Sequence, residues 1–232
     1  MKHDKFSSLS ILFFLLCVRS FVFSQEIKSE APDAQTSGRI EFVEGRWTKQ
    51  KARTPDYGFE VFVFLNKDNP ELRKWKDIKV LNRRTGEFIQ CIDAEGEGVV
   101  FPVADELVGL TDFNFDGEMD FYIKTADGGA GPNDSSDFFI FDKKNKRFVL
   151  DDELSKMTQV LIDSKNKKIT SAYRDGCCRH HEETYAYRAG SRVLIHAWDQ
   201  VLTMDGWLET SVGQLIGKKM RYKTTRVKQK IQ

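Results

Sequence analysis

Oxygen-bearing side chains are concentrated in one short stretch of the chain, residues 112–120, where they are spaced by two or four positions. A loop that curls around a hard cation such as calcium presents oxygens from alternate residues, and a glycine at its sixth position allows the sharp bend. Gly117 holds that sixth position. The pattern predicts a calcium site with five ligands, the backbone carbonyl of Glu118 among them: Asp112, Asn114, Asp116, Glu118 and Asp120.

The same residues would also suit a turn without an ion, because Asp and Asn side chains readily accept backbone hydrogen bonds in turns. Without a cation, however, exposed carboxylates this close together would repel one another by about 1 kcal/mol per pair. The loop is not an EF-hand, since the twelfth position, where that motif has a bidentate glutamate, is Ile123. Its flanks alternate as strands do, so the sequence predicts a self-contained loop between two strands.

Short apolar stretches bounded by turn residues position this loop. Period-two alternation and β-branched or aromatic residues predict strands at residues 58–66, 78–82, 87–93, 106–112, 119–126, 137–142, 147–150, 168–175, 183–190, 192–200 and 220–227. Both faces of 58–66 are apolar, so we expect this strand to be buried on both, and residues 151–159 allow one or two helical turns. The predicted fold class is mainly β, with antiparallel sheets in a sandwich or a propeller-like array.

The N-terminal residues have the pattern of an export signal. Lysines at positions 2 and 5 precede the apolar run LSILFFLL, which is too short to span a bilayer. Cleavage before Gln25 would leave a polar leader and one β domain, so we expect a signal peptide at 1–24, a flexible leader at 25–38 and a single domain at 39–228. The protein would be periplasmic or secreted, with no transmembrane segment in the mature chain; the alternative is an uncleaved anchor.

The formal net charge of +1 hides an uneven distribution along the 232 residues. Residues 217–232 carry seven basic side chains and no acidic one, whereas residues 25–216 carry 26 basic and 34 acidic ones. A nucleic-acid-binding domain needs a broad basic face, so we expect no nucleic-acid partner. The basic end is typical of a solvated strand and tail. The alternative is attraction to an anionic envelope or an acidic partner.

Three cysteines remain after the predicted cleavage: Cys91, Cys177 and Cys178. Thiols tend to pair in an oxidising compartment, and an odd number leaves one free. We favour a bridge from Cys91 to Cys177 or Cys178, which would close a loop of about 85 residues and stabilise the fold by about 4–5 kcal/mol on a chain-entropy estimate. A bridge between the two neighbours is the alternative. The adjacent His180 and His181 suggest zinc at first sight, but neighbouring residues cannot easily supply the corners of a tetrahedron.

A glycine-rich loop follows the predicted calcium site, at residues 127–134. A phosphate-binding loop would continue into Gly-Lys-Ser/Thr and a helix, and here a strand follows, so nucleotide binding is not expected. Either this loop packs over the calcium turn, or it is an exposed finger that enters a partner's cleft, as loops on rigid scaffolds do. The second interpretation assigns partner contacts to four residues: Gly128, Gly129, Asn133 and Asp134.

No compact group of residues in the sequence indicates catalysis. Glu182 and Glu183 are adjacent, so on a strand they point to opposite faces. A hydrolase whose residues are scattered along the chain is one alternative. Three aromatic residues, which we expect to lie in the core, could also line a platform for a sugar: Tyr185, Trp198 and Trp207.

A family resemblance adds to these patterns. The phrase TDFNFDGEMDFYI resembles the calcium loop of FG-GAP-type (integrin-like, VCBS-type) β-propeller proteins. The segments GGAGPND, DFFIFDKKNKRF, LSKMTQVLIDSKNKKITS and DGCCRHHEETYAYRAGSRV follow it in an order that is similar to a family of small exported calcium-loop proteins. That family includes a periplasmic lysozyme inhibitor, the immunity protein for a peptidoglycan hydrolase delivered by a type IV secretion system. The likeness covers residues 104–200 and carries over only the five calcium positions.

The resemblance implies a binding protein rather than an enzyme. It would inhibit a lysozyme-type enzyme that lyses cell walls, with the calcium loop holding residues 127–136 in a shape that fits the enzyme's cleft. The alternative is a module that binds glycan or the cell envelope and has no inhibitory activity.

Overall fold

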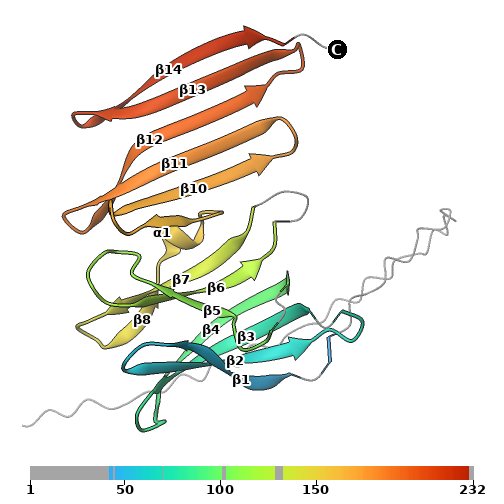
Figure 1. The fold of residues 1–232 in the computed structure, drawn as a ribbon, viewed down its shortest axis with the longest axis vertical. Helices are drawn as coiled ribbons and strands as arrows, with labels where there is room; N and C mark the ends of the chain where they lie inside the picture. The colour runs from blue at the N-terminus through green and yellow to red at the C-terminus, as the bar shows by residue number, and fades with distance from the viewer. Residues whose placement is uncertain (1–41, 44, 70, 101–102, 129–132, 230–232) are drawn as a thin grey trace, which may run out of the picture. The chain divides into compact units, whose positions relative to one another are not determined.

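The computed structural model describes residues 42–229, with gaps at residues 44, 70, 101–102 and 129–132. The predicted signal peptide and leader lie outside the described residues. Residues Ile40–Gln232 form one compact unit. Its described part contains fourteen strands and one short helix (Figure 1). The prediction of a mainly β fold built from antiparallel sheets is therefore confirmed.

The strands form three open sheets that follow one another along the sequence. The first sheet has the order β1-β2-β3-β4: β1 (Arg46–Arg53), β2 (Tyr57–Leu65), β3 (Leu72–Asn82) and β4 (Phe88–Val100). The second has the order β5-β6-β7-β8: β5 (Val108–Thr111), β6 (Asp120–Ala126), β7 (Ser135–Asp142) and β8 (Arg147–Leu150). The third runs from β14 back to β9: β9 (Leu161–Asp163), β10 (Lys168–Asp175), β11 (Arg179–Arg188), β12 (Ser191–Leu202), β13 (Trp207–Ile216) and β14 (Lys219–Lys228).

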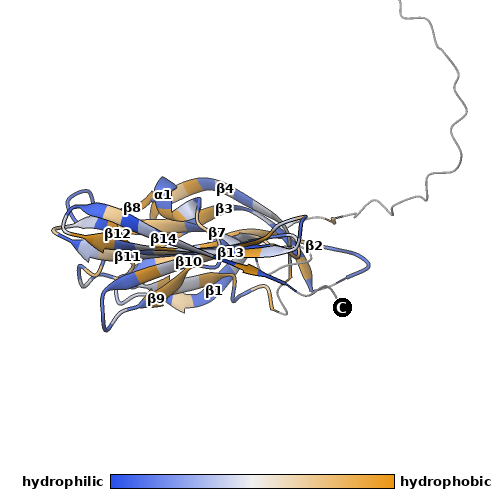
Figure 2. Cartoon of the chain, turned by 90° about the horizontal axis from the view of Figure 1, so that it is seen from above, coloured by the Kyte–Doolittle hydropathy of each residue, from blue (hydrophilic) through white to orange (hydrophobic). Residues whose placement is uncertain are grey.

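Alternating residues decide which face of a strand is buried, and in Figure 2 hydrophobic and hydrophilic segments follow one another along single strands. In β2, the side chains of Phe59, Val61 and Val63 are at most 1% exposed. The opposite face carries Phe62 and Phe64, which are half-buried and contact each other with ring centroids 5.2 Å apart. The expectation that β2 is buried on both faces is thus wrong for the second face, which no other sheet covers in the described residues.

A first core joins the first and second sheets. Phe59 of β2 contacts Phe121 of β6 with centroids 4.9 Å apart, and Phe121 stacks on Phe139 of β7 at 4.6 Å. Trp75 of β3 is fully buried, and its indole N–H donates a 2.8 Å hydrogen bond to the carbonyl oxygen of Lys124. Burying each such side chain stabilises the fold by about 1.5–3 kcal/mol. The second sheet is therefore held against the first along β6.

A second core lies on the other side of the second sheet. It contains Phe113 and Phe138 together with Leu154 and Ile169, which belong to the helix and to β10. The helix α1 (Asp152–Ser155) is a single turn at the start of the predicted helical region 151–159. Asp151 caps it, because its carboxylate accepts a hydrogen bond from the Leu154 N–H at 3.0 Å. The third sheet therefore packs against the second through the helix and the first part of β10.

A buried ion pair fastens the helix to the third sheet. The guanidinium of Arg192, on β12, donates to both carboxylate oxygens of Asp151, at 2.5 and 2.7 Å, and also to Glu153 at 2.9 Å. The Arg192 and Asp151 side chains are only 9% and 14% exposed. Burial opposes ionisation of Asp151, but the hydrogen bonds from Arg192 and Leu154 prevail and lower the pKa of its carboxyl. Each of these two buried side chains is therefore stabilised in its charged form by the other.

Short hairpin turns form the connections β7–β8, β9–β10 and β11–β12. Three observed strands were not predicted, namely β1, β9 and β13. Within the described part of the chain, no helix is long and apolar enough to cross a membrane.

Candidate functional site

The predicted calcium loop connects two neighbouring strands of the second sheet. β5 ends at Thr111 and β6 begins at Asp120, and these two residues pair across the sheet. Residues 112–119 therefore form a loop whose two ends are fixed by the strand pairing. The strands that flank the loop confirm that it is not an EF-hand, in which helices occupy these positions.

Side-chain oxygens of the loop accept hydrogen bonds from its own backbone. The Asp112 carboxylate accepts from the N–H groups of Asp116 and Gly117, at 3.1 and 2.9 Å. Asn114 Oδ1 accepts from the Asp116 N–H at 3.0 Å, and Asp116 Oδ1 accepts from the Glu118 N–H at 2.9 Å. These bonds hold the backbone of residues 112–118 in a tight curl. Gly117 has a φ of +91°, a conformation that strains any residue with a Cβ, which explains a glycine at this position.

Asp120 is the buried anchor of the loop, with no exposed surface. Its two oxygens accept hydrogen bonds of 2.8 Å from the N–H groups of Phe113 and Phe141. Burial raises the pKa of its carboxyl to about 6, against the opposing effect of these two hydrogen bonds, and the negative charges of Asp112 and Asp116 add to the rise. A buried carboxylate that faces two further acids is a site where a cation would be stabilised.

A lysine already lies at the outer side of the loop. Lys143, in the β7–β8 turn, donates a 2.9 Å hydrogen bond to the carbonyl oxygen of Asp116. Its Nζ is also 3.6 Å from Asp116 Oδ1 and from Glu118 Oε1. The ammonium group shows that these oxygens attract a positive charge. Because it is half-exposed and sits on a long side chain, it can move away when another cation competes.

The loop resembles a calcium loop in its donor atoms and in their spacing along the chain. All its donors are oxygens, the atoms that calcium prefers. Among the described residues, no three acidic, histidine or cysteine side chains converge closely enough to hold a metal ion as they stand. Binding therefore requires the carboxylates of Asp112 and Asp116 to turn toward one point. Two other turns of the chain, at Asp142 and Asp163, are each built with a single Asp and one Asn, so a turn alone does not need so many acids.

The phenylalanines of the loop fix it to the rest of the molecule. The ring of Phe113 is 1% exposed and contacts Phe138 edge-on at 4.8 Å between centroids. The ring of Phe115 contacts Tyr187 of β11 at 5.3 Å. Phe115 itself has a φ of 58°, which costs a residue other than glycine about 1–2 kcal/mol. The loop is thus held between the second and third sheets by aromatic packing.

The glycine-rich loop is tied down at both of its described ends. At the first end, Asp127 forms an ion pair with Lys124 and accepts a 2.5 Å hydrogen bond from the Val100 N–H. At the other end, Asp134 forms an ion pair with Lys124 at 3.0 Å and accepts a 3.3 Å hydrogen bond from the Gly128 N–H. Of the predicted partner contacts, Gly129 lies outside the described residues, and Asp134 and Gly128 contact each other.

The remaining predicted contact, Asn133, is paired with the third sheet. Its amide donates to the carbonyl oxygen of Arg174 at 2.7 Å and accepts from the Arg174 N–H at 2.8 Å. The side chain therefore extends the edge of β10 much as a backbone group would. The assignment of these residues to a partner stays a prediction. In the structure, Gly128, Asn133 and Asp134 make contacts that hold the two ends of the loop.

The cysteines pair differently from the favoured expectation. Cys177 and Cys178 form a disulfide with each other, in the turn between β10 and β11. Cys91 is an exposed free thiol on β4. The long-range bridge from Cys91 is wrong, because Cys177 and Cys178 are bonded to each other and Cys91 is left free. The alternative pairing of neighbours is the one present.

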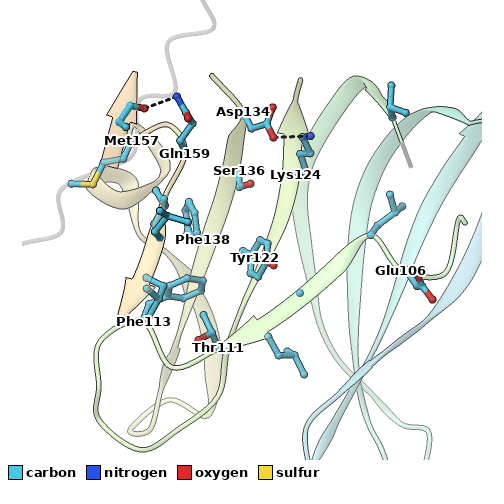
Figure 3. Close-up of a pocket in the computed structure, with 18 residues that line it drawn as sticks. Glu106, Thr111, Phe113, Tyr122, Lys124, Asp134, Ser136, Phe138, Met157 and Gln159 are labelled. Carbon is cyan, nitrogen blue, oxygen red and sulfur yellow. Dashed lines mark hydrogen bonds and ion pairs between the residues drawn. The ribbon is translucent and has the colours of Figure 1, made fainter. Parts of the chain in front are cut away.

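A groove lies beside the glycine-rich loop, with a volume of about 740 Å³. Figure 3 shows the rings of Phe113, Tyr122 and Phe138 inside it and the polar side chains of Lys124 and Asp134 at its rim. Such a volume is in the range of small-ligand sites. The Tyr122 ring fits because Gly109 faces it on β5, where a Cβ would come within 2.2 Å of the ring.

A further polar cluster was missed because it joins side chains of two strands, β11 and β12. His181 on β11 lies 3.4 Å from Glu183, and its other ring nitrogen lies 3.9 Å from Asp199 of β12. Arg179 forms an ion pair with Asp199 at 3.3 Å. The period of β11 puts Arg179, His181 and Glu183 on one face, which the sequence could have shown once the strand was known. His180 points to the opposite face, so the two histidines do not act together.

Comparisons with known proteins support the fold. No protein-family model matches the chain, and no curated protein matches it in sequence. A solved structure described as a Xanthomonas type IV secretion system related protein has a similar fold, with a TM-score of 0.54 and 19% sequence identity. The match covers 77% of this chain and 93% of that one. At this level of identity the likeness concerns the fold.

Proposed function

We propose that this chain is an exported calcium-binding protein that binds and inhibits a lysozyme-type enzyme of the cell wall. The observation that carries the calcium part is the loop at 112–120, where a buried carboxylate, Asp120, lies near Asp112 and Asp116 in a backbone ring closed by Gly117. The ligands would be the side chains of Asp112, Asn114, Asp116 and Asp120 and the carbonyl oxygen of Glu118. The ion would supply the positive charge that offsets their repulsion.

The inhibitory part is supported by the family resemblance of residues 104–200 and by the fold shared with a protein related to a type IV secretion system. That description belongs to the other protein, and its extension to this chain is part of the proposal. Export is proposed on the pattern of residues 1–24, which the structure does not describe.

One strand would connect the ion to the binding surface. β6 begins at Asp120, in the calcium loop, and ends at Ala126, next to the glycine-rich loop. Seven residues of strand span about 20 Å. Lys124 near the end of β6 pairs with Asp127 and Asp134 at the two feet of that loop. A rigid β6 would therefore hold the loop in one shape before the enzyme arrives, which lowers the ordering cost of binding.

Calcium binding is tested by isothermal titration and by thermal melting in calcium and in EGTA. The informative variant is Asp116→Asn, because the amide oxygen can still accept the Glu118 N–H while the charge is lost. The matched control is Asp142→Asn, in the β7–β8 turn, where the same change removes an acid of an ordinary turn. We expect calcium to raise the melting temperature of the native chain and of the control, and Asp116→Asn to weaken binding about tenfold or more. Equal melting in calcium and EGTA would refute the calcium site.

Inhibition is tested separately, by the clearing of a cell-wall suspension by a lysozyme-type enzyme. We expect the native chain to slow clearing in calcium, and less in EGTA or with Asp116→Asn. A chain that binds calcium but leaves clearing unchanged would refute the inhibitory role. If that chain were instead retained on peptidoglycan with no enzyme present, the glycan-binding alternative would be correct.

A further inference from the structure

The outer edge of the third sheet is open. β14 is the last strand in the order of that sheet and pairs with β13 through ten residue pairs with no register shift. Every residue of β14 is exposed except Met220, which is half-buried. Half of the backbone N–H and C=O groups of an edge strand point away from the sheet and can pair with another chain. Within the described residues, no other strand covers this edge.

Three cations form a row on one face of β14, at alternate positions: Lys219, Arg221 and Lys223. None of them makes an ion pair with an acidic side chain in the described part of the chain. The residues opposite them on β13 carry no negative charge: Ile216, Gln214 and Val212. Side chains two positions apart on a strand are about 7 Å apart. This face therefore carries regularly spaced positive charge that the sheet itself does not compensate.

The other face of β14 is different, because its cations are already paired. Arg226 forms an ion pair with Glu209 at 2.8 Å, and Lys228 donates to the carbonyl oxygen of Asp205 at 2.9 Å. Both also lie over the ring of Trp207, at 4.9 and 5.1 Å from its centroid. Arg226 and Lys228 therefore already have partners within the chain. Among the described residues of β14, the absence of such a partner is specific to the row of Lys219, Arg221 and Lys223.

The face that carries Arg226 offers apolar contacts further along the strand. Tyr222 is 62% exposed and Met220 is half-buried, and both lie on that face. The ring of Tyr222 packs over Gly213, where a Cβ would come within 2.5 Å of the ring. The substantial contacts of β12, β13 and β14 are with neighbouring strands of the same sheet. Both faces beside the edge are thus accessible to the side chains of an added strand.

We propose that β14 binds an extended segment of a partner protein in which acidic and apolar residues alternate, added as a further strand of the third sheet. Its backbone would pair with the free edge. Its acidic residues would lie beside Lys219, Arg221 and Lys223, at the separation of cross-strand neighbours, about 5 Å. Its apolar residues would lie beside Met220 and Tyr222 on the opposite face. A second copy of β14 paired antiparallel about Arg221 would place cations against cations, so an acidic segment fits this edge better.

Two peptides of identical composition test the proposal by fluorescence anisotropy with the full chain. Each has ten residues, the length of β14. In one, Glu and Val alternate; in the other, five Glu precede five Val. Because successive side chains point to opposite faces, only the alternating peptide can put every acid on one face. We expect it to bind about tenfold more tightly or better, and to protect the backbone amides of β14 from deuterium exchange.

Charge reversal at the centre of the row is the second arm. Arg221→Glu should weaken binding of the alternating peptide about 3–10-fold, and the milder Arg221→Gln about 2–3-fold. The matched control is Lys218→Glu, which makes the same charge change in the exposed turn before β14 and should alter binding less than about twofold. An unchanged melting temperature shows that the variants are folded.

Three outcomes would overturn the proposal. No binding of the alternating peptide at about 1 mM would mean that the edge is closed to a strand. Equal binding of the two peptides would show a basic patch that accepts any polyanion, such as a charged envelope polymer. A dimer that forms through β14 and excludes the peptide would show that a second copy is the occupant.

Discussion

The buried carboxylate of Asp120 makes a pH-dependent contribution to stability whose sign follows from the structure. The unfolded chain ionises this group near pH 4, whereas burial raises its pKa in the folded chain to about 6. Below about pH 4 both states are protonated, and above about pH 6 both are ionised and only the folded state has a buried charge. In calcium-free buffer the contribution of Asp120 to stability is therefore fully present below pH 4 and is lost as the pH rises through about 6.

The size of this loss follows from the shift. A pKa raised from 3.8 to about 6 is a difference of about two units, and each unit corresponds to 1.36 kcal/mol, so the free energy of unfolding should fall by about 3 kcal/mol. Bound calcium would stabilise the ionised form instead. At a free concentration of about 100 times its Kd, it would add about 2.7 kcal/mol to the free energy of unfolding at neutral pH.

The assay is urea unfolding of the native chain and of Asp120→Asn in EGTA, at several pH values from 4 to 7. Asparagine does not titrate and cannot accept from both Phe113 and Phe141, so it lowers stability by an amount that does not depend on pH. Subtracting the free energies of unfolding of the two proteins at each pH removes the contributions of the other acidic groups, which both proteins share. We expect the native chain to lose about 2.5 kcal/mol relative to the variant between pH 4 and pH 7, because part of the change already occurs below pH 4.

The control is an acidic residue whose contribution to stability depends on pH in the opposite direction. Hydrogen bonds from Asn145 lower the pKa of Asp142, so its contribution to stability should be lost as the pH falls rather than as it rises. Asp142→Asn compared with the native chain should show that reversed slope. A difference between the native chain and Asp120→Asn that is flat from pH 4 to pH 7 would show that burial does not outweigh the two hydrogen bonds to the Asp120 carboxylate.

Three further changes test other contacts of the structure. Arg192→Leu leaves the Asp151 carboxylate buried without its partner and should lower the free energy of unfolding by about 3–5 kcal/mol. Adding Asp151→Ser, which keeps the helix cap, should restore part of that stability. A loss below about 1 kcal/mol for Arg192→Leu would contradict the buried pair. Gly117→Ala places a Cβ at a φ of +91° with no atom nearby, so a pure backbone strain of about 1–2 kcal/mol should appear in urea unfolding. Lys143→Gln removes a competing cation 3.6 Å from Asp116 and should tighten calcium binding about fivefold by isothermal titration; weaker binding would show that the ammonium assists the loop.

Local patterns of the sequence were sufficient for the strands and for the loop. Alternation around Phe59 and Val61 predicts both the strand β2 and its buried face, because every second side chain of a strand shares a side. The spacing of Asp112, Asn114 and Asp116 predicts a tight loop, and the structure builds one in which each of these side chains accepts backbone hydrogen bonds. These features depend on residues fewer than ten positions apart.

Contacts between distant residues could not be predicted in this way. The Asp151–Arg192 pair joins residues 41 positions apart, and the His181–Asp199 contact joins two strands whose register depends on a hairpin between them. β1 was missed because most of its residues are basic or polar and its alternation is weak, and in the structure it pairs with β2.

The contact between Phe115 and Tyr187 gives the loop an influence beyond its own sheet. A change in the curl of residues 112–119 must move the Phe115 ring, and that ring rests on β11. The loop therefore joins the second and third sheets through one aromatic contact, and a change in its conformation would act first on β11, three strands away from the open edge at β14.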